Sequence, residues 1–226
     1  MKTVRTKAIV LRRTNYGEAD RILQLLTPDG RRSVIAKGVR REKSKLAGGI
    51  ELFAVTDVVI GEGRGDLGII TSARLIHFYN HIIEDYDRLQ FGYTVIKQVA
   101  RASETLDEPE WFLLLSEVLV GLDTVSLPLD MTRIWFYVRF ADILGHRLNL
   151  ETDVAGKKLQ ADLRYRYDSA EQGLVESSNG LLEATHIKLL RLISSKSLAV
   201  LVQIGGVDSV LQECLSVARQ HAAIED

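Results

Sequence analysis

The repeat of the apolar residues changes near residue 80, and this change restricts the folds that the chain can adopt. Before it, apolar residues come in short runs rich in β-branched side chains and bounded by Gly, Pro, Asn and Asp. After about Glu84 they recur every three or four residues, which is the spacing of one helix face. The sequence therefore predicts an α+β protein of two domains, a β domain at residues 1–80 and a mainly helical domain at residues 81–226.

The first domain is predicted to be a small barrel. Its second and third strands meet at Thr27-Pro28-Asp29-Gly30, where proline presets one turn dihedral and glycine accepts a positive φ. Strands with one long polar excursion between the third and fourth suggest a closed barrel, and the five-stranded OB-fold is the commonest such barrel that binds oligonucleotides. A half-open sheet would give much the same pattern. The five predicted strands cover residues 4–12, 21–26, 32–37, 53–60 and 68–75.

The second domain is predicted to consist mainly of helices. One apolar stripe comprises Leu89, Tyr93, Ile96 and Ala100. Pro109 followed by Glu110 suits a first helical turn, which tolerates a missing N–H and favours negative charge. Helices are therefore predicted at residues 109–122, 135–144, 183–193 and 207–222, with a small hairpin that pairs residues 159–167 with 173–177.

The charge balance changes at the same place as the apolar repeat. Residues 1–80 carry fifteen Lys and Arg against eight Asp and Glu, whereas residues 81–226 carry fourteen against twenty-two, so the net charge of −1 hides segments of +7 and −8. Seven cations lie within fifteen positions, with Glu42 the only acid among them: Arg31, Arg32, Lys37, Arg40, Arg41, Lys43 and Lys45. A polyanion-binding surface and a solvated loop would both give this composition.

The spacing of the cations from Lys37 to Lys45 favours a nucleic-acid backbone as the polyanion. An extended chain there would present them to successive phosphates, and Ser44 could add a hydroxyl contact. Aromatic residues on which bases could stack are few in this domain. We therefore expect binding directed at the sugar-phosphate backbone rather than at a base sequence.

Sequence patterns of enzymes are weak. Residues 63–68 match the dinucleotide motif G-x-G-x-x-G, but Ile69, Ile70 and Thr71 favour a strand where the motif requires a helix, so a hairpin turn is predicted. No serine or cysteine stands in a recognisable nucleophile elbow. We expect no catalytic activity and no cofactor.

The histidines, the single cysteine and the hydropathy of the chain bear on metal binding, disulfide bonding and membrane insertion. His77 and His81 lie four residues apart without a third metal ligand nearby, which predicts a polar surface rather than a metal site. The single cysteine, Cys214, excludes an intrachain disulfide and is predicted to be a buried small residue on a helix. No stretch approaches the ~18 consecutive apolar residues of a spanning helix, so we expect a cytoplasmic protein without membrane contact.

Four short blocks carry the most specific pattern in the chain. They are Tyr16-Gly17-Glu18-Ala19-Asp20-Arg21, then residues 27–30, then Ala36-Lys37-Gly38-Val39-Arg40-Arg41 with Ser44, then Leu52-Phe53. In order and spacing these blocks resemble the N-terminal domain of the RecO family of bacterial DNA repair proteins. The helical remainder is similar in layout, so the resemblance covers nearly the whole chain.

The resemblance implies a non-enzymatic recombination mediator with an OB-fold followed by a helical domain. Members of the family bind single- and double-stranded DNA, anneal complementary strands, and act with RecR and single-stranded DNA-binding protein (SSB) to load RecA. Such a protein would be cytoplasmic and associated with the nucleoid. An RNA-binding OB-fold protein that acts on structured RNA is the alternative.

The matching basic residues are the DNA contacts that the resemblance implies. These are Lys37, Arg40, Arg41, Lys43 and Lys45, with Arg31 and Arg32 as further candidates. Arg21 is as well explained by a pair with Glu18 or Asp20. In the acidic second domain, residues 135–144 form either a groove for the acidic, hydrophobic-ended SSB tail, with Arg133 or Arg139 as the cation, or ordinary core.

Many members of the family carry a zinc site made of two C-x-x-C pairs, and this chain lacks it. The equivalent positions are Thr152, Ala155, Glu176 and Asn179, none of which supplies a thiolate. The chain therefore resembles the metal-free members, and we expect its hairpin lobe to be held by packing of residues such as Tyr165, Tyr167, Leu174 and Val175, together with Leu159 and Leu163.

Overall fold

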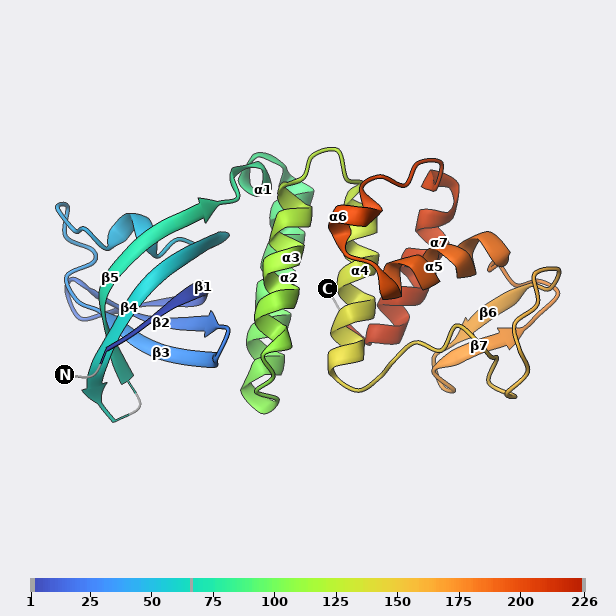
Figure 1. Ribbon diagram of the computed structural model, residues 1–226, viewed down its shortest axis with the longest axis horizontal. Coiled ribbons are helices and arrows are strands. Elements are labelled where there is room, and N and C mark those ends of the chain that lie inside the picture. Colours follow the sequence, from blue (N-terminus) through green and yellow to red (C-terminus); the bar gives the residue numbers. More distant parts are fainter. Residues whose placement is uncertain (1–2, 66, 225–226) are drawn as a thin grey trace. The chain divides into compact units, whose positions relative to one another are not determined.

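The computed structural model describes residues 3–65 and 67–224 and divides the chain into two compact units, Met1–Asp123 and Thr124–Asp226. Within the described part of the first unit, strands close into a barrel in the order β1-β2-β3-β5-β4 (Figure 1). The only parallel pairing there joins β3 to β5, from Ser33–Leu67 to Ile35–Ile69. The strands are β1 (Thr3–Tyr16), β2 (Asp20–Thr27), β3 (Gly30–Ala36), β4 (Ala54–Arg64) and β5 (Leu67–Phe78). The predicted OB-type barrel is confirmed.

Alternation along the strands sorts the residues of the barrel into an inner and an outer set. Val10 pairs with Leu25 and both side chains are buried in the barrel core, together with Leu23 and Val34. The register of β1 shifts between Val10 and Arg12, so that Arg12 pairs with Gln24. Because Gln24 neighbours the inward Leu25, it points outward and Arg12 shares the outer face.

The barrel is followed in the same unit by helices that pack on it. They are α1 (Asn80–Glu84), α2 (Tyr86–Thr105) and α3 (Glu110–Asp123), and a 3-10 turn, η1 (Ala47–Gly49), precedes β4. The Asp85 carboxylate accepts a hydrogen bond from the Arg88 amide at 3.0 Å, which caps the N-terminus of α2. Helix α2 contacts β1, and α3 contacts β2.

The buried face of α2 differs from the predicted stripe. Phe91, Val95 and Val99 are its most buried apolar residues with Ile96, whereas Tyr93 is 47% exposed. The Phe53 ring packs on the Gly92 side of α2, so closely that a Cβ on Gly92 would be 2.8 Å from Phe53 Cε1. The tight contact fixes which side of α2 faces the barrel.

The second unit contains the helices α4 (Leu129–Ile143), α5 (Ala184–Ser195), α6 (Leu198–Leu201) and α7 (Asp208–Ala222), and a hairpin of β6 (Tyr165–Asp168) and β7 (Gly173–Glu176). Helix α4 contacts α5, α6 and α7. Trp135, Phe136, Tyr137, Val138 and Phe140 are all at most 4% exposed, so α4 is buried around most of its circumference. Of the two interpretations of residues 135–144, these side chains fit the core. No helix in the described residues is long and apolar enough to cross a lipid bilayer.

The lobe that contains the hairpin of β6 and β7 is held by packing and hydrogen bonds. Tyr165 and Leu174 on the hairpin are buried. The Asp153 carboxylate accepts hydrogen bonds from the amides of Ala155 (3.0 Å) and Lys157 (2.8 Å), and the Val154 amide donates to the Leu174 carbonyl (2.9 Å). These bonds close the loop at the positions equivalent to the first C-x-x-C pair.

A hydrogen-bonded chain ties the hairpin to α7. The Tyr167 hydroxyl lies 2.8 Å from His221 Nδ1, and His221 Nε2 lies 2.7 Å from the His146 carbonyl oxygen. Since a carbonyl only accepts, Nε2 carries the proton, and Nδ1 of the neutral ring accepts from Tyr167. Burial lowers the pKa of His221, and burial raises the pKa of Tyr167 to about 12.

The hydrogen bonds from Tyr167 through His221 to His146 predict that the stability of the protein depends on pH. The lowered pKa means that the unfolded state binds a proton more readily than the folded state, so the free energy of unfolding falls as pH decreases through the ordinary value of 6.5. We expect His221→Gln to lower stability at pH 7.5 by about 1–2 kcal/mol through weakened buried hydrogen bonds. The variant should also lose less stability than wild type between pH 7.5 and pH 5.5. Urea unfolding at both pH values measures this, and equal losses in the two proteins would contradict it.

Candidate nucleic-acid interface

The basic loop that follows β3 is anchored to the turn between β1 and β2. Asp20 Oδ1 accepts a hydrogen bond from the Gly38 amide at 2.6 Å, and the Arg40 amide donates to the Ala19 carbonyl at 2.9 Å. Gly38 has a φ of +64°, a conformation that favours glycine. The loop is therefore attached at its start by two bonds to residues about twenty positions earlier in the chain.

The loop is coiled rather than extended, which corrects the expectation from its spacing. Turns are closed by bonds from the Arg41 amide to the Gly38 carbonyl (3.1 Å) and from the Ser44 amide to the Arg41 carbonyl (3.0 Å). The Ser44 hydroxyl accepts from the Leu46 amide at 3.3 Å. Val39 is buried in the barrel core, which pulls the chain inward between exposed cations. Sequence spacing could not reveal this, because the anchoring groups lie on another hairpin.

The five cations on this loop point to solvent. Lys37, Arg40, Arg41, Lys43 and Lys45 are exposed, and none of them takes part in an ion pair within residues 3–65 and 67–224. Arg40 Nη1 donates to the Gly17 carbonyl at 3.3 Å, which leaves its charge uncompensated. An anchored loop with five such charges creates a positive surface that attracts polyanions. We call this set of residues the loop cations.

Arg31 and Arg32 lie on opposite faces of β3. Arg31 Nη2 donates to Gln24 Oε1 and to Glu104 Oε1 of α2, both at 3.1 Å. Its side chain is only 20% exposed, and Glu104 compensates its charge, so it links the barrel to α2. Arg32 pairs with Leu25 and lines the open end of the barrel. Neither arginine belongs to the set of loop cations.

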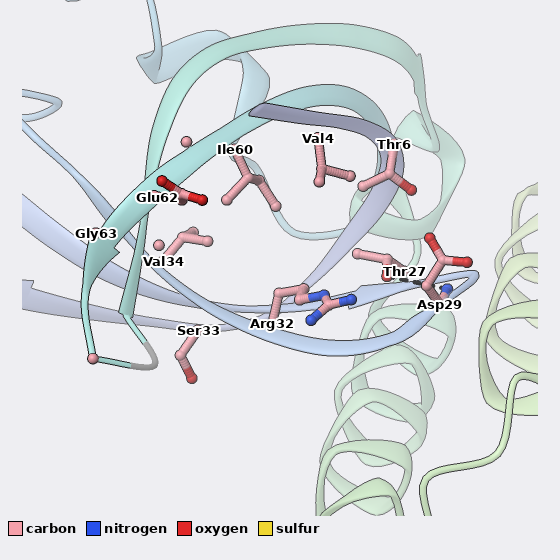
Figure 2. A pocket seen from close by; sticks show the side chains of 13 residues that line it. Val4, Thr6, Thr27, Asp29, Arg32, Ser33, Val34, Ile60, Glu62 and Gly63 are labelled. Atoms are coloured by element: carbon pink, nitrogen blue, oxygen red, sulfur yellow. Dashed lines mark hydrogen bonds between the residues drawn. The ribbon is translucent and has the colours of Figure 1, made fainter. Parts of the chain in front are cut away.

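The open end of the barrel is a cavity of about 480 Å³ with mixed charge. Val4, Val34 and Ile60 form its apolar wall. Figure 2 shows the Arg32 side chain near Thr27 and Asp29, with Glu62 on the other side of the opening. One arginine with two carboxylates offers little net attraction for phosphate, so the loop cations are the stronger candidate for an anion site.

The glycine motif at residues 63–68 is a hairpin turn, as predicted. Arg64 pairs with Leu67, and β5 rather than a helix follows. Gly65 has a φ of +61°, and a Cβ on Gly68 would lie 2.7 Å from Ile60 Cγ2. Glycine is thus required by the turn and by close strand packing. Asp66 lies outside the described residues.

The remaining candidate residues have local partners. Arg21 Nε donates to Asn15 Oδ1 at 3.1 Å, and within the described residues Arg21 forms neither of the ion pairs, with Glu18 or with Asp20, that were offered as the alternative to a DNA contact. His77 and His81 both lie near the Asp123 carboxylate, at 3.7 and 3.3 Å, and no metal-binding group of three or more ligands occurs in the described residues. The buried Cys214 thiol has a pKa raised to about 12 by burial.

In the second unit, both arginines proposed for a partner groove lie on α4. Arg133 Nη1 is 2.9 Å from Asp130 Oδ1. The Arg139 guanidinium lies 5.6 Å from the centroid of the Trp135 ring, and Arg139 Nη2 donates to the Lys196 carbonyl at 3.4 Å. Arg139 Nε is buried without a hydrogen-bond partner in the described residues.

Comparison with known proteins gives the family. Residues 1–79 match the family described as Recombination protein O N terminal, and the matched segment contains all five barrel strands. A protein of Dehalococcoides mccartyi strain CBDB1 named DNA repair protein RecO is 32% identical over 219 residues, which cover 92% of this chain and 85% of that relative. The chain belongs to the RecO family.

Other RecO relatives support this membership. DNA repair protein RecO of Synechococcus elongatus strain PCC 7942 is 32% identical over 219 residues, covering 93% of this chain and 82% of the relative. The RecO protein of Roseiflexus strain RS-1 is 30% identical over 207 residues, covering 88% and 72%. Because these matches span both compact units, the chain as a whole is a member of this family of DNA repair proteins.

The anchor of the basic loop leads to a testable prediction. We expect Asp20→Ala to remove a charge-assisted hydrogen bond that contributes about 1.5–3 kcal/mol to the local stability of the loop. Tryptic cleavage after Arg40, Arg41 and Lys43 should then rise by at least ~10-fold, because local opening exposes the chain. Asp29→Ala, on the neighbouring β2–β3 turn, should be cleaved like wild type. Mass spectrometry of timed digests gives the rates, and an unchanged rate in Asp20→Ala would refute the anchoring role.

Proposed function

We propose that the protein is a non-enzymatic DNA-binding mediator of recombinational repair, and that the loop cations bind the sugar-phosphate backbone. The observation that carries the proposal is the anchored loop with five exposed cations free of ion pairs within the described residues, in a chain of the RecO family. Binding of such a surface releases counterions from DNA and is sensitive to salt.

In addition to its charge, the fixed shape of the loop supports binding of DNA. Asp20 and Ala19 hold the backbone at Gly38 and Arg40 before any ligand arrives. A preordered loop loses less conformational entropy on binding than a mobile one. Contacts to phosphates carry no base sequence, so the same surface can bind single strands and duplexes.

Strand annealing and RecA loading are the finer steps of the proposal. Cations on the barrel reduce the repulsion between two complementary strands, which favours annealing. Residues 81–226 carry a net charge of −8, which disfavours DNA over most of that segment and leaves much of its surface to protein partners. RecR and the SSB tail are the partners proposed from the family, and association with the nucleoid would follow from DNA binding.

An RNA-binding protein with the same barrel is the second candidate function. The loop cations would bind RNA phosphates as well as DNA phosphates, because neither the charge nor the loop shape distinguishes the two. Membership of a DNA repair family favours DNA. Competition between single-stranded DNA and RNA of equal length, measured with the assay below, separates the candidates.

Charge reversal of the loop tests the proposed function. The triple variant Arg40→Glu, Arg41→Glu and Lys43→Glu should lose strand annealing, and its affinity for single-stranded DNA should fall at least ~10-fold. The salt dependence should weaken by about 2 in log–log slope, from roughly 0.7 per lost phosphate contact. Fluorescence anisotropy at several salt concentrations measures both quantities.

The control for this variant reverses the same amount of charge elsewhere. Lys157, Lys158 and Lys188 are exposed in the second unit, and their triple change to Glu should leave annealing intact. If the control variant loses as much strand annealing as the loop variant does, the effect comes from net charge only. Intact annealing in the loop variant would overturn the proposed function, and a preference for RNA would favour the alternative.

The partner groove on the second unit has a separate test. We propose that Arg133 or Arg139, which are partly exposed on α4, binds an acidic carboxylate of the SSB tail, although the aromatic residues of that helix are buried in the core. Isothermal titration with a peptide of acidic residues ending in an apolar residue should show affinity reduced at least ~5-fold in Arg133→Ala or Arg139→Ala, the loss of one charged hydrogen bond. Unchanged affinity in both variants would remove these residues from the proposal.

A further inference from the structure

A groove of about 380 Å³ lies within the first unit, where α2 runs beside the barrel. Its floor and wall are apolar, with Leu11 of β1 and Ile96, Ala100 and Tyr93 of α2. The volume lies at the lower end of the range for small-ligand pockets, about 300–1,000 Å³. The groove is separate from the loop cations and from the cavity at the barrel end, since these sites share no lining residue.

Three cations line this groove, and its one carboxylate, Glu104, is paired with Arg31 instead. Arg12 of β1 and Lys97 and Arg101 of α2 are exposed, and none forms an ion pair within the described ranges 3–65 and 67–224. Lys97 and Arg101 are four residues apart on α2, so they lie on one face with a spacing of roughly 6 Å. That spacing is comparable with the distance between successive phosphates of an extended strand.

Tyr93 gives the groove an aromatic wall in a fixed position. Its ring meets Phe53 edge to face, with centroids 5.1 Å apart and an interplanar angle of 68°. Phe53 is itself buried against Gly92. Tyr93 is nevertheless 47% exposed, so part of the held ring is available to a ligand. A rigid exposed aromatic ring beside cations is the arrangement on which bases of single strands stack.

Polar groups at one end of the groove complete the match to a nucleotide. Gln24 and Glu104 line the groove, and Arg31 bonds to both and holds them in place. An amide and a carboxylate can bond to the polar edge of a base, while the apolar floor faces its ring. A nucleotide thus supplies an apolar face, a polar edge and an anion, each of which has a partner among the residues that line the groove.

An acidic peptide would also bring apolar and anionic groups, but the position of the groove favours a nucleic-acid strand. Arg12, Thr14 and Tyr16 alternate along the outer face of β1, and Tyr16 is 55% exposed. From Arg12 to Tyr16 the strand advances roughly 13 Å. Tyr16 adjoins the turn at Gly17 and Ala19 to which Arg40 of the loop is bonded. A strand of a few nucleotides can reach from the loop cations to the groove.

We propose that this groove accepts one unstacked base of single-stranded nucleic acid, which stacks on Tyr93, while Arg12, Lys97 and Arg101 bind the flanking phosphates. The inference rests on the proposed function and extends it, because it adds a contact that depends on bases. A duplex keeps its bases paired and stacked, so the contact between a base and Tyr93 contributes to single-strand binding alone.

Abasic DNA separates the base contact from the phosphate contacts. We expect Tyr93→Leu, which keeps an apolar side chain but removes the ring, to weaken binding of an oligo-dT strand by roughly five- to 150-fold, the range for one stacked base. Binding of an abasic strand of equal length and of a duplex should stay within twofold of wild type. Ala100→Phe, which fills the groove and keeps Tyr93, should give the same pattern. Thermal unfolding checks that each full-length variant is folded.

The cations are tested by salt dependence. The double variant Lys97→Ala and Arg101→Ala should bind oligo-dT and the abasic strand with equally reduced affinity. The log–log salt slope of binding should fall by about 1.4, at roughly 0.7 per phosphate contact. Lys157→Ala with Lys158→Ala removes the same charge from the second unit and should leave the slope unchanged.

The outcomes distinguish the groove from the proposed function as a whole. If the loop reversal abolishes binding but Tyr93→Leu and Ala100→Phe bind oligo-dT like wild type, the groove proposal is overturned and the proposed function stands. If wild type binds no DNA even at low salt, both fail. An acidic peptide that requires Lys97 and Arg101 for binding, with oligo-dT unaffected by their loss, would assign the groove to a protein partner and overturn the proposal.

Discussion

The pairing of β1 with β2 is the interaction on which both candidate binding surfaces depend. Its register puts Val10 and Leu25 into the barrel core and, after the shift before Arg12, places Arg12 and Gln24 on the outer face. Its turn supplies Ala19 and Asp20, which anchor the basic loop. A slip by one residue would exchange the two faces, remove the core and displace the groove residues together.

The fold could be predicted from the sequence to a large extent, because the barrel is built from local signals. Short apolar runs rich in β-branched residues predicted each strand and Thr27-Pro28-Asp29-Gly30 predicted a turn, and β2 and β3 were found within about two residues of their predicted bounds. The helices predicted at 183–193 and 207–222 from the apolar period were found within about two residues of those bounds. What these elements share is that their signals lie within a few residues of each other.

The candidate site could be predicted less well, because its geometry depends on contacts between distant residues. The coil of the loop depends on the Asp20 carboxylate, eighteen positions before Gly38. Arg31 is neutralised by Glu104, seventy-three positions away. The exposed position of Tyr93 follows from the contact of Phe53 with Gly92. In the sequence Tyr93 belongs to an apolar stripe, and only the tertiary contact shows that it faces solvent.

The two surfaces of the first unit differ in what they would recognise, and the difference has a physical consequence. The loop cations act through charge, so their affinity is nearly the same per phosphate for any strand and falls with salt. The groove acts through an aromatic face, which a base reaches only after it leaves its own stack, at a cost of a few kcal/mol in a duplex. Single strands present bases with little of that cost. Under the two proposals, one small barrel therefore binds either form of DNA by charge and favours the single strand by stacking a base on Tyr93. Added salt weakens the charge contacts, so it should increase the preference for single-stranded DNA over the duplex.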